Sequence, residues 1–247
     1  MRNIRITIEY DGKDFKGWQK QPNKLNIQGE IERAIEIITG GEKVELIGSG
    51  RTDAGVNALG QVANFKIESQ MPIEKIPYAL NSQLKQSIRI VKAEEVDERF
   101  HSRYSCKKKT YNYVINNSEQ GTAIYRNMQY HFPIKLDDKK MAEAVKYLIG
   151  EHDFKSFKAS GTSSKSSVRT IYDASVVRNG DLITIELTGN GFLYNMIRII
   201  AGTLLEVGQG KIEPEEVKNI LEAQDRSKAG KTLPPNGLTL VRVIYDE

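Results

Sequence analysis

The residues best suited to chemistry are an arginine and an aspartate two positions apart in the glycine-rich stretch Gly48 to Asn57. Arg51 and Asp53 lie among three glycines, which permit positive φ angles and a tight turn. The flanking segments 43–47 and 61–68 alternate between apolar and polar residues, as strands do. The pattern therefore predicts a loop between two strands that presents one aspartate able to act as a nucleophile or a base.

Two other interpretations apply to the same stretch. Glycine-rich turns often contain an aspartate whose carboxylate only accepts hydrogen bonds from nearby backbone N–H groups. A dinucleotide-binding fingerprint would need a third glycine at the right spacing and a helix after the loop, and the sequence has neither. The structural turn therefore stays open as an alternative, whereas a dinucleotide site is disfavoured.

Composition indicates a globular protein with a mild positive charge. The chain has 247 residues, of which 39% are hydrophobic and 28% charged, and its net charge is +4. This length allows one large domain or two of ordinary size. The charge is compatible with a polyanionic partner without requiring one.

Cysteine and histidine usage argues against disulfides and metal sites. Cys106 is the single cysteine, and the three histidines are scattered at positions 101, 131 and 152 without zinc-ligand spacing. The first residues alternate like a strand instead of forming a signal peptide, and no apolar run has membrane-spanning length. We expect a cytoplasmic protein without a metal ion.

The order of predicted elements is similar in the two halves of the chain. The first half has strands over 3–10 and 88–96 around the central loop, with a helix capped by Asn26 and a second helix over 72–80. In the second half we predict strands over 110–116, 168–178, 181–188 and 238–245, and helices from Asp137, over 194–207 and over 214–223. The second-half hairpin is centred on Asn179-Gly180.

Two split β-α-β units in tandem predict an α+β fold with two ferredoxin-like halves. The halves would share a mixed, mainly antiparallel sheet with helices outside, and a ligand would bind between them. We place the boundary so that residues 1–103 form the N-terminal half and residues 104–247 the C-terminal half.

The boundary segment, Arg99 to Lys109, has five basic residues interleaved with aromatic ones. Such a composition suits phosphate contacts together with stacking on RNA bases. A run of charges is also typical of an ordinary solvated surface. A second aromatic candidate, Trp18, lies in a basic, glycine-rich loop and could either stack on a base or seal the end of a core, and we favour the core.

Arg198 is the second charged residue with a functional pattern, because it lies within a helix that is apolar on most of its circumference. A buried guanidinium is unfavourable unless it pairs with an anion. Arg198 therefore either occupies a narrow exposed strip or reaches a carboxylate, for which Asp53 is the candidate. Gly202, one turn later, would allow another element to approach closely.

Several blocks of the sequence are similar to those of the tRNA pseudouridine synthase A family, and the resemblance covers nearly the whole chain. The blocks are Gly50 to Val56, Tyr10 to Gly12, Gly17 to Gln19, Arg99 to Ser105, Tyr111 to Tyr113, Asp153 to Phe157, Gly191 to Arg198, and Gly237 to Val241. Two departures occur: Asn57 stands where the family commonly has histidine, and Cys106 where it has alanine.

The resemblance implies roles for individual residues. Asp53 matches the catalytic aspartate, Tyr111 the tyrosine that packs against the target uracil, and Arg198 the arginine that pairs with the carboxylate. Arg51 and the boundary segment would neutralise phosphates. The family implies the pseudouridine synthase fold with a central basic cleft, a homodimer, no metal or organic cofactor, and tRNA as partner, modified at uridines 38 to 40 of the anticodon stem-loop.

The implied reaction breaks the C1′–N1 bond of uridine, turns the uracil and rejoins it to the sugar through C5. It exchanges no electrons and needs an ionised carboxylate, which an arginine partner would keep charged. The target nucleotide must leave its stack to reach the carboxylate. Whether the carboxylate attacks C6 or C1′ stays open on the sequence.

Two other functions stay open as alternatives. A non-catalytic RNA-binding module would gain little from a carboxylate next to phosphates, so Asp53 argues against it. A nucleoside glycoside-cleaving enzyme usually needs a second carboxylate, and the nearest candidates, Glu45 and Glu68, are predicted to face solvent.

Overall fold

The computed structural model describes residues 1–161 and 166–245. The chain forms two compact units, which we call unit 1 and unit 2. Unit 1 contains residues Met1–Lys107 and the C-terminal segment from Leu240, and unit 2 contains Lys108–Thr239. The division into an N-terminal half of residues 1–103 and a C-terminal half of residues 104–247 stays a prediction.

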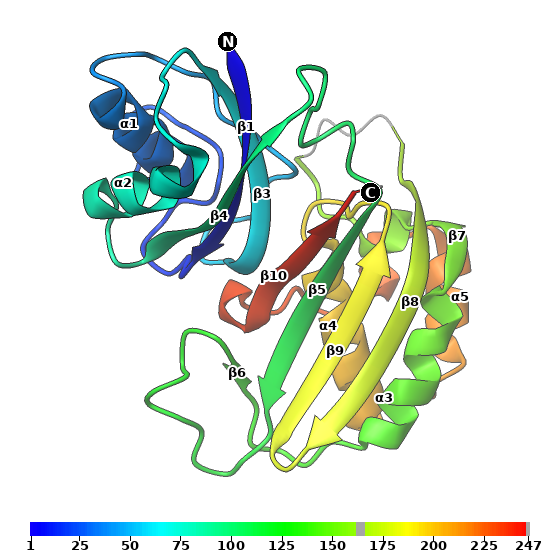
Figure 1. The fold of residues 1–247 in the computed structure, drawn as a ribbon. Coiled ribbons are helices and arrows are strands. Elements are labelled where there is room, and N and C mark those ends of the chain that lie inside the picture. Colours follow the sequence, from blue (N-terminus) through cyan, green and yellow to red (C-terminus); the bar gives the residue numbers. More distant parts are fainter. Residues whose placement is uncertain (162–165, 246–247) are drawn as a thin grey trace. The chain divides into compact units, whose positions relative to one another are not determined.

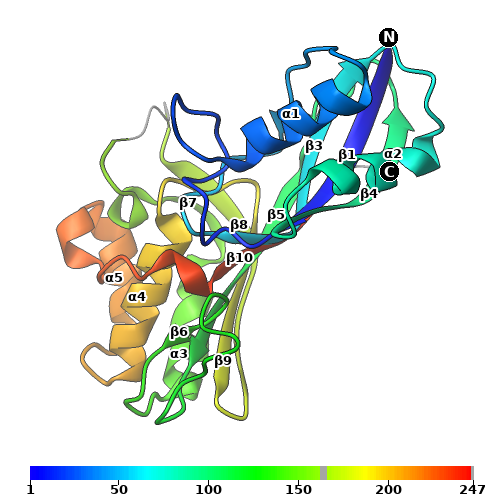
Figure 2. The same ribbon diagram turned by 90° about the vertical axis from the view of Figure 1, so that its left-hand side faces the viewer.

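Unit 1 is a small antiparallel sheet covered by two helices on one face (Figure 2). Its strands are β1 (Arg2–Tyr10), β2 (Ile47–Gly48), β3 (Asn57–Ile67) and β4 (Ile88–Val96), and its helices are α1 (Ile27–Ile38) and α2 (Ile76–Gln83), the latter preceded by a 3-10 turn at Ile73–Lys75. The strands are hydrogen-bonded in the order β4-β1-β3-β2. This is the βαββαβ arrangement that the sequence predicts.

Unit 2 repeats the arrangement with additional elements, and its central strands lie side by side in Figure 1. Its strands are β5 (Lys108–Asn116), β6 (Tyr130–His131), β7 (Gly150–Asp153), β8 (Val168–Asn179), β9 (Leu182–Gly189) and β10 (Leu238–Ile244), and its helices are α3 (Asp138–Ala144), α4 (Met196–Gly208) and α5 (Glu216–Ala223). The strand order is β10-β5-β9-β8-β7, so β5, β8, β9 and β10 take the places of β1, β2, β3 and β4. From Leu240 onward, β10 belongs to unit 1.

The predicted fold class is confirmed. The ten described strands pair mainly antiparallel, the short β6 being parallel to β5, and five α-helices accompany them. Among the described residues, no helix is long and apolar enough to cross a membrane.

Local sequence chemistry accounts for the boundaries of several elements. Asn26 caps α1, because its Oδ1 accepts a hydrogen bond from the backbone N of Gly29 at 2.8 Å. The β8–β9 hairpin is confirmed, although its two-residue loop is Gly180-Asp181, one position later than predicted. Gly180 has φ +58° and is followed by a residue without positive φ, which fits a type II′ turn.

The predicted strand over 43–47 is wrong, because only Ile47 and Gly48 are in a strand. Two side chains of α1 take the hydrogen bonds that a strand partner would make. The backbone N of Leu46 donates to Glu32 Oε1 at 3.2 Å, and its carbonyl accepts from Gln28 Nε2 at 3.1 Å. Strand β3 begins at Asn57, four residues earlier than the pattern indicates.

Helix α4 is buried along most of its length, as predicted, and begins at Met196 because Asn195 has φ +59°. Arg198 therefore lies in the first turn of the helix. The prediction for Gly202 is confirmed: a Cβ atom there would lie 1.9 Å from the carbonyl oxygen of Lys231. The backbone at residues 230 and 231 packs directly on the helix.

We expect Gly202→Ala to destabilise the protein by about 3 kcal/mol, because the Lys231 backbone must move away from the new methyl group. This loss outweighs the gain of about 1 kcal/mol that Gly→Ala normally brings in a helix. Urea denaturation monitored by circular dichroism measures the change. Gly191→Ala is the control, since a Cβ atom there meets only the Arg169 side chain at 3.7 Å, and equal stabilities of the two variants would contradict the argument.

Candidate active site

Asp53 begins a tight turn between β2 and β3. Its carbonyl oxygen accepts a hydrogen bond from the backbone N of Val56 at 3.1 Å, and Gly55, the third residue of the turn, has φ +78°. The aspartate is half-buried and Arg51 is exposed. The structure thus gives the charged loop that the glycine pattern predicts, with the carboxylate at the turn and the guanidinium in solvent.

The segment after β1 holds the loop from its other side. The backbone N of Trp18 donates to the carbonyl of Thr52 at 3.0 Å, and the hydroxyl groups of Tyr10 and Thr52 are 2.7 Å apart. Both side chains are buried. The residue immediately before Asp53 is therefore fixed through its backbone and its side chain.

Two glycines make this close approach possible. A Cβ atom on Gly12 would lie 2.0 Å from the carbonyl oxygen of Val56. On Gly17, which has φ +88°, it would lie 2.8 Å from the carbonyl oxygen of Thr52. These residues belong to the Tyr10 to Gly12 and Gly17 to Gln19 blocks, and their lack of a side chain allows two backbone segments to touch.

Trp18 is a core residue. Only 2% of Trp18 is exposed. Its indole packs closely on Gly48, because a Cβ atom added to Gly48 would lie 2.6 Å from the ring. Its backbone carbonyl accepts from the N of Gln28, which ties the loop to α1. The interpretation of Trp18 as a seal for the core is confirmed, and a burial of this extent excludes stacking on a base.

Gln61 fixes the other end of the loop, a role that the sequence analysis does not predict. It is fully buried; its Oε1 accepts from Ser49 Oγ at 2.7 Å, and its Nε2 donates to the carbonyl of Gly50 at 3.0 Å. A glutamine inside a strand whose neighbours are apolar was the available indication, since a buried amide needs partners.

Asn57, the departure from the family pattern, has a structural contact of its own. It is 3% exposed, and its Oδ1 accepts from the backbone N of Gly12 at 2.8 Å. The asparagine therefore joins the start of β3 to the glycine that packs on Val56.

Arg198 in unit 2 is half-buried and held by uncharged oxygens. Its Nε donates to the carbonyl of Leu233 at 2.6 Å, and its Nη1 to Oδ1 of Asn195 at 2.6 Å. The backbone N of Leu233 returns a hydrogen bond to the carbonyl of Arg198 at 3.2 Å. These contacts set the direction of the guanidinium.

Tyr111 lies on β5 and is 8% exposed, with its ring edge-on to Phe192 at a centroid distance of 5.2 Å. Two residues further along the strand, Tyr113 is buried and donates its hydroxyl to the carbonyl of Pro234 at 2.8 Å. A Cβ atom on Gly237 would lie 2.8 Å from that ring.

The segment from Leu233 to Gly237 thus organises both Arg198 and Tyr113, and it does so through backbone carbonyls. Side-chain patterns could not have indicated it, because any residue type offers the same carbonyl group. The available sign was Gly237 itself, which opens the last block of the family resemblance.

The structure groups the predicted site residues by unit. Arg51 and Asp53 share one loop of unit 1, whereas Tyr111 and Arg198 belong to unit 2. In the boundary segment, the side chains that are exposed include Arg99, Arg103, Lys107 and Lys108. Among the described residues, no group of three or more His, Cys, Asp or Glu side chains could hold a metal ion.

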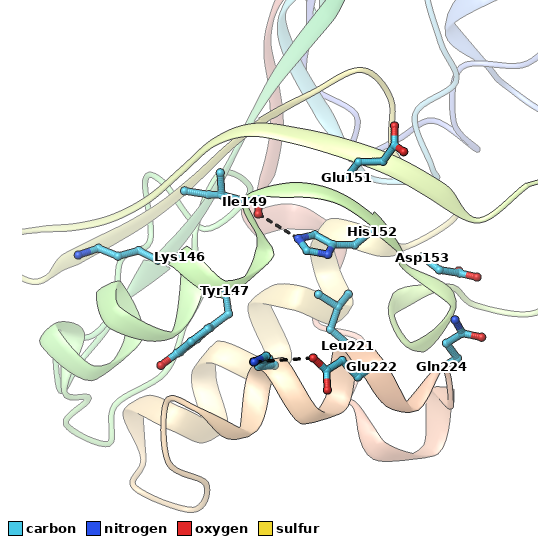
Figure 3. A pocket seen from close by; sticks show the side chains of 10 residues that line it. Lys146, Tyr147, Ile149, Glu151, His152, Asp153, Leu221, Glu222 and Gln224 are labelled. Atoms are coloured by element: carbon cyan, nitrogen blue, oxygen red, sulfur yellow. Dashed lines mark hydrogen bonds and ion pairs between the residues drawn. The ribbon is translucent and has the colours of Figure 1, made fainter.

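A separate hollow of 630 Å³ lies in unit 2 and contains none of the predicted site residues (Figure 3). Its wall comes from the end of the α3 region, β7 and α5. His152 faces it with Nε2 hydrogen-bonded to the carbonyl of Ile149 at 2.9 Å, and Lys218 pairs with Glu222 across a turn of α5. The lining mixes both charges, which does not favour one class of ligand.

The comparison with known proteins decides the family. The model of the tRNA pseudouridine synthase family matches residues 6–105 and 144–246. The chain belongs to this family. Proteins named tRNA pseudouridine synthase A are 56% identical to it in Caldicellulosiruptor saccharolyticus and 51% identical in Thermoanaerobacter sp. and Acetivibrio thermocellus. Each alignment covers 99% of this chain and 100% of the relative.

Membership of the tRNA pseudouridine synthase family makes the protein an isomerase and confirms the resemblance drawn from the sequence blocks. It decides against a binding module without chemistry and against a glycoside-cleaving enzyme. The structure agrees on the second point, because Glu45 and Glu68 are both exposed, as predicted.

We expect the stability of this synthase to fall as the pH rises above about 10, because burial raises the pKa of Tyr10 and of Tyr113 above the ordinary value of 10.0. In the unfolded chain these hydroxyls lose their protons first, so the stabilisation is complete below pH 10 and is lost above it. Above that pH, each of the two tyrosines lowers the free energy of unfolding by about 1.4 kcal/mol per pH unit.

Urea denaturation between pH 9 and pH 11 checks this slope. Tyr10→Phe should reduce it by the contribution of one proton, whereas Tyr78→Phe should leave it unchanged, because Tyr78 is 76% exposed. If both variants have the wild-type slope, the buried hydroxyl of Tyr10 is not the group that titrates.

Proposed function

We propose that the protein converts uridine to pseudouridine at positions 38 to 40 of the tRNA anticodon stem-loop, with Asp53 as the catalytic nucleophile. The observation that carries the proposal is the similarity to relatives named tRNA pseudouridine synthase A over 99% of the chain. The rigid loop around Asp53 supports it, because a nucleophile must be held in one position to react.

The reaction fits a site with one carboxylate and no external reactant. The C1′–N1 bond breaks, N1 gains a proton, and C5 loses its proton when the C1′–C5 bond forms. Attack by Asp53 at C1′ or at C6 would both use the carboxylate in its ionised form. Atoms and electrons balance within the nucleotide and solvent, so the proposal includes neither a metal ion nor an organic cofactor.

We assign supporting roles to the other site residues. Arg198, with its guanidinium oriented by Leu233 and Asn195, is the proposed cationic partner that keeps the Asp53 carboxylate ionised. Tyr111 is proposed to stack on the uracil while the base turns, its ring orientation being supported by Phe192. Arg51, exposed beside Asp53, is proposed to neutralise an RNA phosphate.

The setting of the enzyme is also part of the proposal. We infer a cytoplasmic homodimer, since its tRNA substrate is in the cytoplasm and the family resemblance implies two copies. Sedimentation equilibrium of the purified protein tests the dimer without reference to activity.

Asp53→Asn should lower the rate of tritium release from tRNA labelled at C5 of its uridines by at least about a thousandfold, because the amide is not a nucleophile. Binding of tRNA should persist, since the substitution keeps the shape of the side chain and removes a charge that repels phosphates. Asp14→Asn is the control, because Asp14 is an exposed carboxylate of the same unit.

Loss of activity in both variants, or in neither, would contradict the assignment of Asp53. Chemical mapping of pseudouridine in the product by primer extension then tests the predicted positions. Pseudouridine outside positions 38 to 40 would keep the reaction and overturn the proposed site.

The affinity for tRNA should fall steeply with added salt, because each neutralised phosphate changes the slope of log K against log salt by about −0.7 to −0.9. Arg51→Gln should make this slope shallower by the amount that one phosphate contact contributes. The exposed Lys85 provides a matched control, and Lys85→Gln should retain the wild-type slope. A flat response of the wild type would contradict a basic RNA-binding surface.

A further inference from the structure

The boundary segment contains an aromatic pair that the functions assigned above do not use. The ring of Tyr104 stacks on the ring of His101, with centroids 4.2 Å apart and an angle of 30° between the planes. Tyr104 is nevertheless 78% exposed. One face of the Tyr104 ring therefore stacks on His101, while the other face is open to solvent. A second planar group could stack on that open face.

The backbone around this pair forms a closed turn. The N of Ser105 donates to the carbonyl of His101 at 2.9 Å, and the N of His101 donates to Ser105 Oγ at 3.2 Å. The ring of His101 is fixed as well, because its Nδ1 accepts from the N of Arg103 and from the N of Tyr104, both at 3.2 Å. The histidine is therefore a rigid support under the tyrosine ring.

Ser102 anchors the turn in the core of unit 1. It is fully buried; its N donates to Asn64 Oδ1 at 2.8 Å, and its carbonyl accepts from the hydroxyl of Tyr245 at 2.8 Å. The neighbouring Phe100 packs against Tyr245 with a centroid distance of 5.1 Å. The aromatic pair thus projects from a rigid turn. Its side chains therefore have little conformational freedom to lose when a ligand binds.

The charges beside the platform select the kind of ligand. Arg103 is exposed within the turn, and the side chain of Arg99 is 93% exposed although it contacts Asp97. An exposed ion pair of this kind is worth little, so Arg99 can exchange its partner for a phosphate. Guanidinium groups next to an exposed ring are the combination that binds single-stranded RNA, by phosphate contacts and by base stacking.

We propose that Tyr104, supported by His101, is a base-stacking site for an unpaired nucleotide of the RNA substrate, with Arg99 and Arg103 contacting the adjacent phosphates. The inference rests on the proposed function and adds a substrate contact to it. The bound base is distinct from the uridine that reacts, because that uridine is assigned to Tyr111 and Asp53.

Equilibrium binding of an unmodified tRNA transcript tests the platform. Tyr104→Ala should weaken binding about tenfold, the usual effect of removing one base stack. Tyr104→Phe and Tyr104→Trp keep a flat ring and should bind as the wild type does or more tightly, whereas Tyr104→Leu should behave like the alanine variant. Tyr78→Ala, which removes a tyrosine of nearly equal exposure (76%) from α2, should have no effect.

Salt dependence separates stacking from charge. Tyr104→Ala should retain the wild-type slope of log K against log salt, because no ionic contact is removed, and Arg103→Gln should lower the slope by about one contact. Thermal unfolding of each variant shows whether the fold is retained. Because the replaced side chains are exposed, we expect the melting temperature to stay unchanged.

Wild-type affinity of Tyr104→Ala overturns the proposal and would direct attention to a protein partner for this surface. Equal losses in Tyr104→Phe and Tyr104→Ala also overturn it, since the hydroxyl and not the ring would then carry the contact. Failure of the proposed function has a different readout, because the wild type itself would then release no tritium from labelled tRNA. A wild type that reacts and binds, with an unaffected Tyr104→Ala, rejects the platform alone.

Discussion

The direct contact between two backbone segments of unit 1 is the constraint on which the candidate site depends. Gly12 and Gly17 allow the chain after β1 to touch the chain on both sides of Asp53, and Thr52 is then held by hydrogen bonds to its backbone and its hydroxyl. A carboxylate held in this way loses little freedom when a substrate binds, which supports the role of nucleophile that we propose for Asp53.

Unit 2 uses the same principle with different groups. The carbonyls of Leu233 and Pro234 orient Arg198 and Tyr113, and the contact of the Lys231 backbone with Gly202 holds the preceding part of that segment against α4. Neutral carbonyls direct a guanidinium without cancelling its charge. The guanidinium of Arg198, oriented in this way, is the cation that we propose as the partner of the Asp53 carboxylate.

The exposed aromatic pair at the boundary segment extends this pattern to the surface. Ser102 is buried and fastened at both its N and its carbonyl, so that His101 and Tyr104 are rigid although they lie in solvent. Rigid support of an exposed ring has no benefit for the stability of the core. It would reduce the entropy lost on binding the base that we propose to stack there.

The sequence by itself determined most of the helices and strands, the Asn26 cap, the hairpin at Gly180 and the family, because these depend on local periodicity, turn chemistry and contiguous motifs. It did not indicate the short strands β6 and β7. Only the tertiary structure decided that Trp18 is buried and that residues 43–46 are not a strand. Both outcomes depend on partners far along the chain, since α1 side chains take the backbone bonds of Leu46. Contacts through backbone carbonyls leave no residue pattern, which is why the hydrogen bond from Arg198 to the carbonyl of Leu233 could not be predicted.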